Sequence, residues 1–166
     1  MIQVKYRVFL LFIASYIFYG WWNINYLFII FFSTIVDYYA GININESQNK
    51  KIRIAYLCLS IIINLSILFF FKYLTFLGTV LSSILNSFSI NYDLPSHNFL
   101  LPVGISFYTF QTLSYTIDVY YQRINPEKNF LKFALYVSFF PQLVAGPIER
   151  AKSLIPQFHF NYSFDY

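Results

Sequence analysis

The sequence predicts an all-α protein, a polytopic bundle of transmembrane helices formed by residues 1–166 as one membrane domain. The chain is 58% hydrophobic and only 11% charged, whereas about a quarter of the residues in a soluble domain are charged. Charged residues occur in short clusters, and four long uncharged runs separate them, at 8–36, 54–71, 73–92 and 94–117. About 18 apolar residues suffice to span a bilayer. We therefore expect a multi-pass protein of the plasma or inner membrane with about four spans.

The first run predicts a helical hairpin rather than one span. A single helix over its 29 residues would be about 44 Å long, against a hydrocarbon core of about 30 Å. Gly20–Asn23 interrupts it, because Gly ends helices, Asn begins them, and its paired Trp residues suit a membrane surface. Helices at about 4–21 and 24–41 would place the basic residues before position 8 and after position 49 on one side. The positive-inside rule makes that side cytoplasmic.

The middle of the chain predicts an outward span, an interfacial helix and a return span. The polar stretch 41–51 is expected to be a cytoplasmic connection, and 52–71 then runs outward. Ser and Asn dilute the next run, 73–92, which favours a helix lying in the outer interface over a full crossing. A turn containing Pro95 is expected at 93–97. Residues 99–121 return inward to a basic loop.

The last apolar stretch, 130–148, predicts a broken or re-entrant helix. It contains Pro141, Gly146 and Pro147, and Pro in a helix interior costs about 3 kcal/mol. Irregular backbone at membrane depth is tolerated only where protein or a water-filled cavity covers it. A substrate path is therefore expected near this break.

Several function classes are excluded or disfavoured by composition. The net charge of +4 forms no basic stripe of the kind that binds nucleic acid. The single cysteine, Cys58, allows no disulfide framework and no Cys-based metal site. The chain also has no phosphate-binding loop, nucleophile triad or metal-ligand cluster. We expect no metal and no cofactor, and the lipid bilayer is the first partner.

Two long runs carry a family resemblance. Leu101–Gln111 contains Pro-Val-Gly-Ile-Ser-Phe-Tyr-Thr-Phe-Gln and continues to Tyr120, and Phe139–Arg150 contains Pro-Gln-Leu-Val-Ala-Gly-Pro-Ile. Both resemble the membrane-bound O-acyltransferase family, in particular its alginate O-acetyltransferase-like branch. The segments 14–23, 33–38 and 69–73 also fit this branch, so the resemblance covers about 8–158.

The resemblance implies a partial version of that fold and an acyl transfer to a hydroxyl. In this branch the acceptor is typically an exported or cell-surface polysaccharide, or a partner acetyltransferase, outside the cytoplasm. The acyl donor is a substrate, either a small molecule or a carrier of the acyl group, and is expected on the cytoplasmic side. The essential His of the family lies downstream of the second run, so the resemblance places the catalytic spans beyond Tyr166. The sequence thus predicts an N-terminal portion that is inactive alone.

The candidate site residues are polar groups in or beside the two runs. A structural and a functional role stay open for each. The structural roles are helix bridging by Gln111 and Gln142 and a pairing of Asp118 with Arg123 near the inner end of the helix. The functional role is the lining of a substrate tunnel. Glu149 and Arg150 fit either an entrance for a phosphate-bearing acyl donor or an interfacial charge pair. His97 and His159 are predicted to be solvated loop residues. The residues that could line a substrate path are Gln111, Tyr115, Asp118, Gln142, Glu149 and Arg150.

Three readings of function remain at this point. The first is part of an O-acetyltransferase acting on a polysaccharide. The second is the sister branch that transfers D-alanine to teichoic acids. The third is a non-catalytic membrane protein, either truncated or an assembly subunit. A broken helix at the midplane would also fit a small transporter piece, a separate class, but the motif match argues against it.

Overall fold

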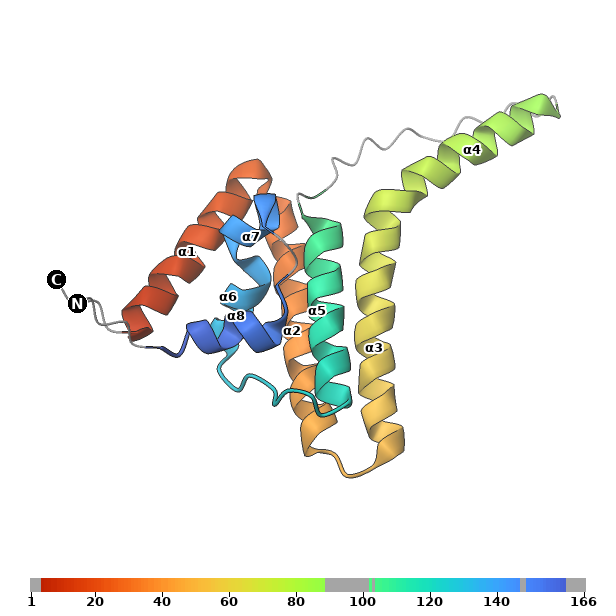
Figure 1. Ribbon diagram of the computed structural model, residues 1–166. Helices are drawn as coiled ribbons and strands as arrows, with labels where there is room; N and C mark the ends of the chain where they lie inside the picture. Colours follow the sequence, from red (N-terminus) through yellow and green to blue (C-terminus); the bar gives the residue numbers. More distant parts are fainter. Residues whose placement is uncertain (1–3, 89–101, 103, 147–148, 161–166) are drawn as a thin grey trace.

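The computed structural model describes residues 4–88, 102, 104–146 and 149–160, and all regular structure in them is helical (Figure 1). The prediction of an all-α fold is therefore confirmed for this part of the chain. The elements are α1 (Val4–Trp22), α2 (Ile24–Glu46), α3 (Lys50–Leu68), a π-helical turn η1 (Phe69–Tyr73), α4 (Leu74–Ser87), α5 (Ile105–Tyr120), α6 (Phe130–Ser138), α7 (Phe140–Ala145) and α8 (Ala151–Gln157).

Two helices are long and apolar enough to cross a membrane. They are α2, with 23 residues, and the continuous helix Lys50–Tyr73, with 24 residues. Their outer surfaces carry large exposed side chains such as Phe28, 72% exposed, and Ile62, 63% exposed. Such surfaces suit contact with lipid acyl chains. The count of about four spans stays a prediction.

The predicted hairpin is confirmed, and its turn is a single residue. Asn23 has an extended backbone, and its side-chain oxygen accepts a hydrogen bond of 2.9 Å from the Asn25 amide. This is the N-cap arrangement that begins α2. The expected end of the second helix at residue 41 is wrong, because α2 continues to Glu46. Gly41 serves packing instead, since a Cβ there would lie 2.9 Å from the Tyr115 ring.

The helix after the second span changes direction at η1. In Figure 1, α4 leaves the top of α3 at an angle and projects away from the bundle. The predicted separate helix over 73–92 is thus present over Leu74–Ser87. The expected turn at 93–97, with Pro95 and His97, lies outside the described residues.

The predicted break in the last apolar stretch is confirmed at Gly146, which ends α7, and a further break lies at Phe139. Pro141 was also expected to interrupt a helix, but it lies in the first turn of α7. The first turn tolerates Pro because its missing amide would have no intrahelical partner there. Pro147 lies outside the described residues. The short helix α8 follows, which the sequence did not predict.

The core lies where α5 meets the helices around it. Helices α2, α3 and α5 pack side by side, and α1 packs on α2 and α6 (Figure 1). The span expected at 99–121 begins later, at Ile105, after Gly104 at a positive φ of 72°. Aromatic rings fill the space between α5 and α6, with the Tyr115 and Phe133 centroids 4.6 Å apart. This packing brings the two motif runs together.

Candidate functional site

The start of α5 is shaped to receive α7. Gly104 adopts the left-handed conformation that glycine tolerates best, and the Ile105 amide donates to the Pro102 carbonyl at 3.2 Å. A Cβ on Gly104 would lie 3.2 Å from a side-chain carbon of Leu143 and 3.3 Å from its carbonyl oxygen. The first motif run therefore contacts the second at its own glycine.

Gln111 connects the two motif runs through the break between α6 and α7. Its side-chain nitrogen donates a 2.9 Å hydrogen bond to the Tyr136 carbonyl and lies 3.4 Å from the side-chain oxygen of Gln142. The Tyr136 hydroxyl donates back to the Gln111 carbonyl at 3.3 Å. Tyr136 lies in the last turn of α6, where carbonyl groups have no intrahelical partner. Gln111 thus caps the broken helix, as its helix-bridging interpretation predicted.

The other side of the break is covered by α1. The Phe140 amide, at the start of α7, donates to the hydroxyl of the buried Ser15 at 3.4 Å. Gln111 and Gln142 are themselves almost fully buried, with 1% and 5% of their surface exposed. Protein therefore covers the irregular backbone, as a break at membrane depth requires. We call Gln111, Gln142, Tyr136 and Ser15 the break junction.

Tyr115 and Asp118 lie farther along α5 and have their own contacts. The Tyr115 hydroxyl accepts a 3.1 Å hydrogen bond from the Glu127 amide. Asp118 forms the expected ion pair with Arg123, with 3.2 Å between their side-chain oxygen and nitrogen. Glu149 and Arg150 are exposed, and Arg150 immediately precedes α8. Of the six candidate residues, the described contacts thus join only Gln111 and Gln142.

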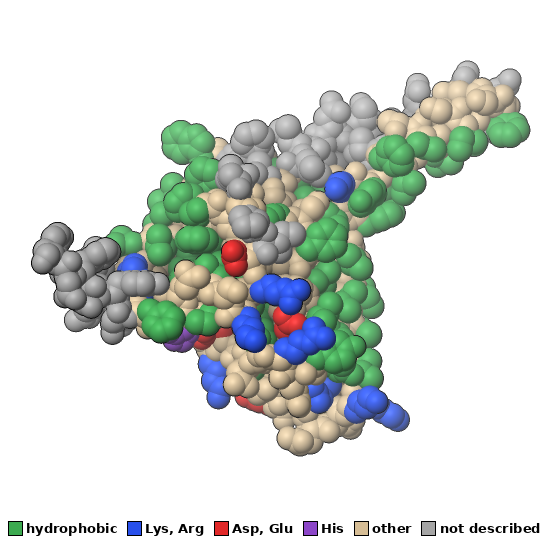
Figure 2. Space-filling model, in the orientation of Figure 1, with side chains coloured by type: hydrophobic (Ala, Val, Ile, Leu, Met, Phe, Trp, Pro, Cys, Tyr) green, Lys and Arg blue, Asp and Glu red, His purple; other side chains and the backbone are tan. Residues whose placement is uncertain are grey.

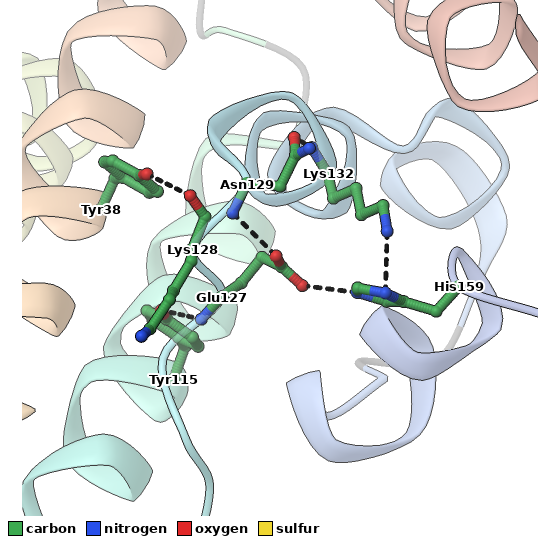
Figure 3. Close-up of polar contacts among 7 residues, drawn as sticks. All are labelled: Tyr38, Tyr115, Glu127, Lys128, Asn129, Lys132 and His159. Atoms are coloured by element: carbon green, nitrogen blue, oxygen red, sulfur yellow. Dashed lines mark hydrogen bonds and ion pairs between the residues drawn. The ribbon is translucent and has the colours of Figure 1, made fainter. Parts of the chain in front are cut away.

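A second polar cluster lies between the loop before α6 and the end of α8 (Figure 3). His159 was predicted to be a solvated loop residue; its ring is half exposed, but both nitrogens have partners. Its Nε2 lies 2.8 Å from a Glu127 carboxylate oxygen, and its Nδ1 lies 2.8 Å from the Lys132 nitrogen. The Glu127 side chain is only 8% exposed, and its other oxygen accepts from the Asn129 amide at 2.8 Å. These contacts attach α8 to the bundle.

A third cluster, which the sequence did not single out, surrounds Asp37 inside the bundle. Asp37 is fully buried on α2 and accepts hydrogen bonds from the Ser60 hydroxyl, at 2.5 Å, and from the Asn64 amide, at 2.9 and 3.0 Å. Thr112 and Thr116 of α5 lie 3.4 Å from Asn64 and 3.3 Å from Ser60. The sequence feature that could have indicated this cluster is a lone Asp beside a long apolar run, since such residues usually face the bundle interior.

The described residues offer no metal centre. No group of three or more His, Cys, Asp or Glu side chains among them could hold an ion. The break junction and the Asp37 cluster consist of amides, hydroxyls and one buried carboxylate, whereas the cluster around Glu127 also contains the His159 imidazole and the Lys132 ammonium group. The break junction contains no group that titrates near neutral pH, so it can position a substrate or a helix but cannot itself move a proton.

Comparison with known proteins finds relatives over almost the whole chain. The chain is 40% identical over 157 residues to the probable alginate O-acetylase of Pseudomonas aeruginosa, which is 93% of this chain and 30% of the relative. It is 38% identical over 159 residues to the Azotobacter vinelandii protein of the same name, with 93% and 31% covered. A peptidoglycan O-acetyltransferase of Helicobacter pylori is 34% identical over 170 residues, with 88% and 31% covered.

The chain therefore spans about 30% of the length of the curated relatives it matches. No family model matches the chain. No solved structure matches it either.

Proposed function

Because this chain is homologous to alginate O-acetylases over 93% of its length, we propose that it forms part of a membrane O-acyltransferase for polysaccharides. The acceptor is a sugar hydroxyl of an exported or cell-surface polysaccharide, and the transferred group is acetyl. The relatives named for alginate and for peptidoglycan both fit this class. They favour acetyl transfer over the transfer of D-alanine to teichoic acid.

The observation that carries this proposal is the meeting of the two motif runs at the break junction. The runs Leu101–Tyr120 and Phe139–Arg150 resemble the same family, and Gln111 of the first caps the helix end that precedes the second. We propose that the junction holds the broken helix in a fixed position, so that the residues after it, Glu149 and Arg150, face the acyl donor on the cytoplasmic side. A guanidinium suits a donor that carries phosphate or carboxylate groups.

The general base for the reaction is proposed to lie outside the described residues. A sugar hydroxyl is a poor nucleophile near neutral pH and needs a base within hydrogen-bond reach. The described histidine, His159, already contacts Glu127 and Lys132, and it makes no contact with the break junction. Because His97 is expected to be a solvated loop residue, we also expect residues 1–166 alone to transfer no acetyl group. Acetylation by the purified chain that is lost in His97→Ala would contradict this expectation.

A chimera tests the proposed function directly. Residues 8–158 replace the homologous segment of the Pseudomonas aeruginosa alginate O-acetylase, and the acetyl content of the secreted alginate is measured in cells lacking the native enzyme. We expect restored acetylation. A chimera that is inserted in the membrane at normal abundance but leaves alginate unacetylated would count against the proposal.

Variants of the chimera then separate positioning from folding. Arg150→Ala should lower acetylation while leaving membrane abundance unchanged, because the side chain is exposed. Arg123→Ala is the matched control, since its side chain is also exposed, at 63%, and is engaged with Asp118. Equal losses of acetylation in both variants would show that the reaction depends on positive surface charge and not on the position of Arg150.

The orientation of the chain is testable with single cysteines. In a Cys58→Ser background, cysteines at the exposed positions Asn45 and Asn125 should resist an impermeant thiol reagent in intact cells. The positive-inside rule places both on the cytoplasmic side. Labelling of either one from outside would reverse the proposed side of donor entry.

A further inference from the structure

Helix α4 has two chemically distinct sides and no charge. Its 14 residues contain no Asp, Glu, Lys or Arg. At 100° per residue, the apolar side chains gather on one half of the helix and the hydroxyl and amide side chains on the other. The first set includes Leu77, Val80, Leu81 and Ile84, which are 39–50% exposed. The second set is Thr79, Ser82, Ser83, Asn86 and Ser87.

The apolar side of α4 is not buried by the rest of the bundle. The helix packs mainly against η1, the turn that precedes it, and Figure 1 shows it projecting away from the other helices. A soluble protein would rarely leave such a helix face uncovered. The preceding helix gives the reason, because α4 begins where the candidate span Lys50–Tyr73, formed by α3 and η1, ends.

The direction of the apolar side matches a membrane surface. In Figure 2 the hydrophobic side chains of the projecting arm lie along its lower edge, on the side toward which α3 extends, and other atoms form the opposite edge. If α3 crosses the bilayer, the hydrocarbon core lies on the side of α4 toward which α3 extends. The apolar half of α4 then faces that core, and the hydroxyl-bearing half faces water.

The polar side of α4 can contact the headgroup layer through hydrogen bonds alone, without ion pairs. The hydroxyls of Ser82, Ser83 and Ser87 donate to the carbonyls of Gly78, Thr79 and Ser83 at 3.0, 2.9 and 2.9 Å. Their protons are thus satisfied within the helix, and their oxygens can still accept hydrogen bonds from water. No cation on α4 is available to recognise anionic lipids.

We propose that α4 lies in the plane of the bilayer surface where the span Lys50–Tyr73 ends, bound to the interface of phospholipids that carry no net charge. The π-helical turn η1 provides the bend between the two directions. Lys72, within that turn, is exposed and lies 3.4 Å from the Ser106 hydroxyl, so its ammonium group can reach the headgroups. This binding surface is independent of the proposed acyl transfer.

Depth measurements on spin labels test this placement. The full chain, with Cys58→Ser, carries one cysteine at a time and is reconstituted in phosphatidylcholine nanodiscs. Relative accessibility to oxygen and to a water-soluble nickel complex reports the depth of each label. Labels at Leu77, Leu81 and Ile84 should share one shallow depth, whereas labels at Thr79, Ser83 and Asn86 should behave as in water. An Ile62 label on α3 is the deep lipid control.

Each alternative placement gives a different pattern. A helix that crosses the bilayer would change depth by about 10 Å between Leu77 and Ile84, at about 1.5 Å per residue. A helix covered by protein would show low access to both reagents at its apolar positions. Either pattern would overturn the proposal. Addition of 20% anionic lipid or 0.5 M salt should leave the in-plane pattern unchanged, and a depth that requires anionic lipid would also contradict it.

Discussion

Helix α5 has two buried polar faces, and they hold different parts of the molecule. One face carries Thr112 and Thr116 and lies against α2 and α3, where Ser60 and Asn64 surround the Asp37 carboxylate. The other face carries Gln111 and lies against α6 and α7, where it caps a helix end. The first face joins three unbroken helices through side chains. The second supports irregular backbone.

This difference predicts different sensitivities. Asp37 is the group on these two faces that can carry a charge, and none of the described Lys, Arg or His side chains forms an ion pair with it. Its hydrogen-bond donors are therefore its main compensation for burial. Gln111 is neutral, and its loss removes the side-chain donor of the Tyr136 carbonyl. We expect the Asp37 face to dominate stability and the Gln111 face to dominate the geometry of the break.

The largest effect is expected for Asp37→Ala. Truncation leaves the side chains of Ser60 and Asn64 buried without their shared acceptor, which should cost about 2–4 kcal/mol of folding free energy. Thermal unfolding of the purified chain in detergent measures this loss as a lower midpoint. Glu46→Ala is the matched control, because it removes an exposed carboxylate from the same helix. Equal midpoints for the two variants would contradict a stabilising Asp37 face.

Gln111→Ala should cost about 1–3 kcal/mol, because the buried Tyr136 carbonyl then loses its donor. We also expect the α6–α7 break to loosen, which faster amide hydrogen exchange over residues 136–142 would report. Gln157→Ala, at an exposed position on α8, is the control and should change neither quantity. Faster exchange confined to α2 and α3 would contradict the separation of the two faces.

Gly41→Ala tests how closely α2 approaches α5. The added methyl group would lie 2.9 Å from the Tyr115 ring, which must shift. Overpacking of this kind costs about 1–3 kcal/mol, and we expect the lower half of that range because a ring can move more readily than backbone. Gly78→Ala in α4 is the control and should be neutral or slightly stabilising, since Ala is the better helix former. A stabilised Gly41→Ala variant would show that the helices are less tightly packed.

The smallest effect is expected for His159→Ala, about 0.5 kcal/mol or less. Its ring is half exposed, so solvent screens its contact with Glu127. Limited proteolysis is the more sensitive measurement, because loss of this contact should expose the chain after α8 to cleavage sooner. Phe160→Ala, which removes an exposed neighbouring side chain, is the control. A large drop in the unfolding midpoint for His159→Ala would show that α8 contributes to the core.

Local features of the sequence predicted the arrangement of the helices well. Asn23 marked the hairpin because capping depends only on the residues beside it. The long uncharged run after Arg53 identified a candidate span, and the density of Pro and Gly after residue 139 identified a broken stretch. Polar dilution after residue 73 separated α4 from α3. Each of these is a property of one segment, independent of its neighbours in space.

The errors came from residues whose roles depend on a partner. Gly41 was expected at the start of the connection, but it lies inside α2, where the absence of a Cβ lets the Tyr115 ring pack against the helix. His159 is a partly exposed loop residue as expected, but its contacts with Glu127 and Lys132, about 30 residues earlier, were not predicted. Asp37 drew no interpretation of its own, because the donors that satisfy it lie on another helix.

The sequence by itself determined the helical class, the hairpin, the separate helix after residue 73 and the family resemblance, because apolar length, caps and sequence motifs are local. Tertiary structure decided that Gln111 caps α6, that Asp37 holds three helices together and that α8 docks against the loop before α6. Those pairings arise from helix packing, which brings together groups that are distant in the chain. Hydrogen bonds between helices depend on that geometry, and no single segment encodes it.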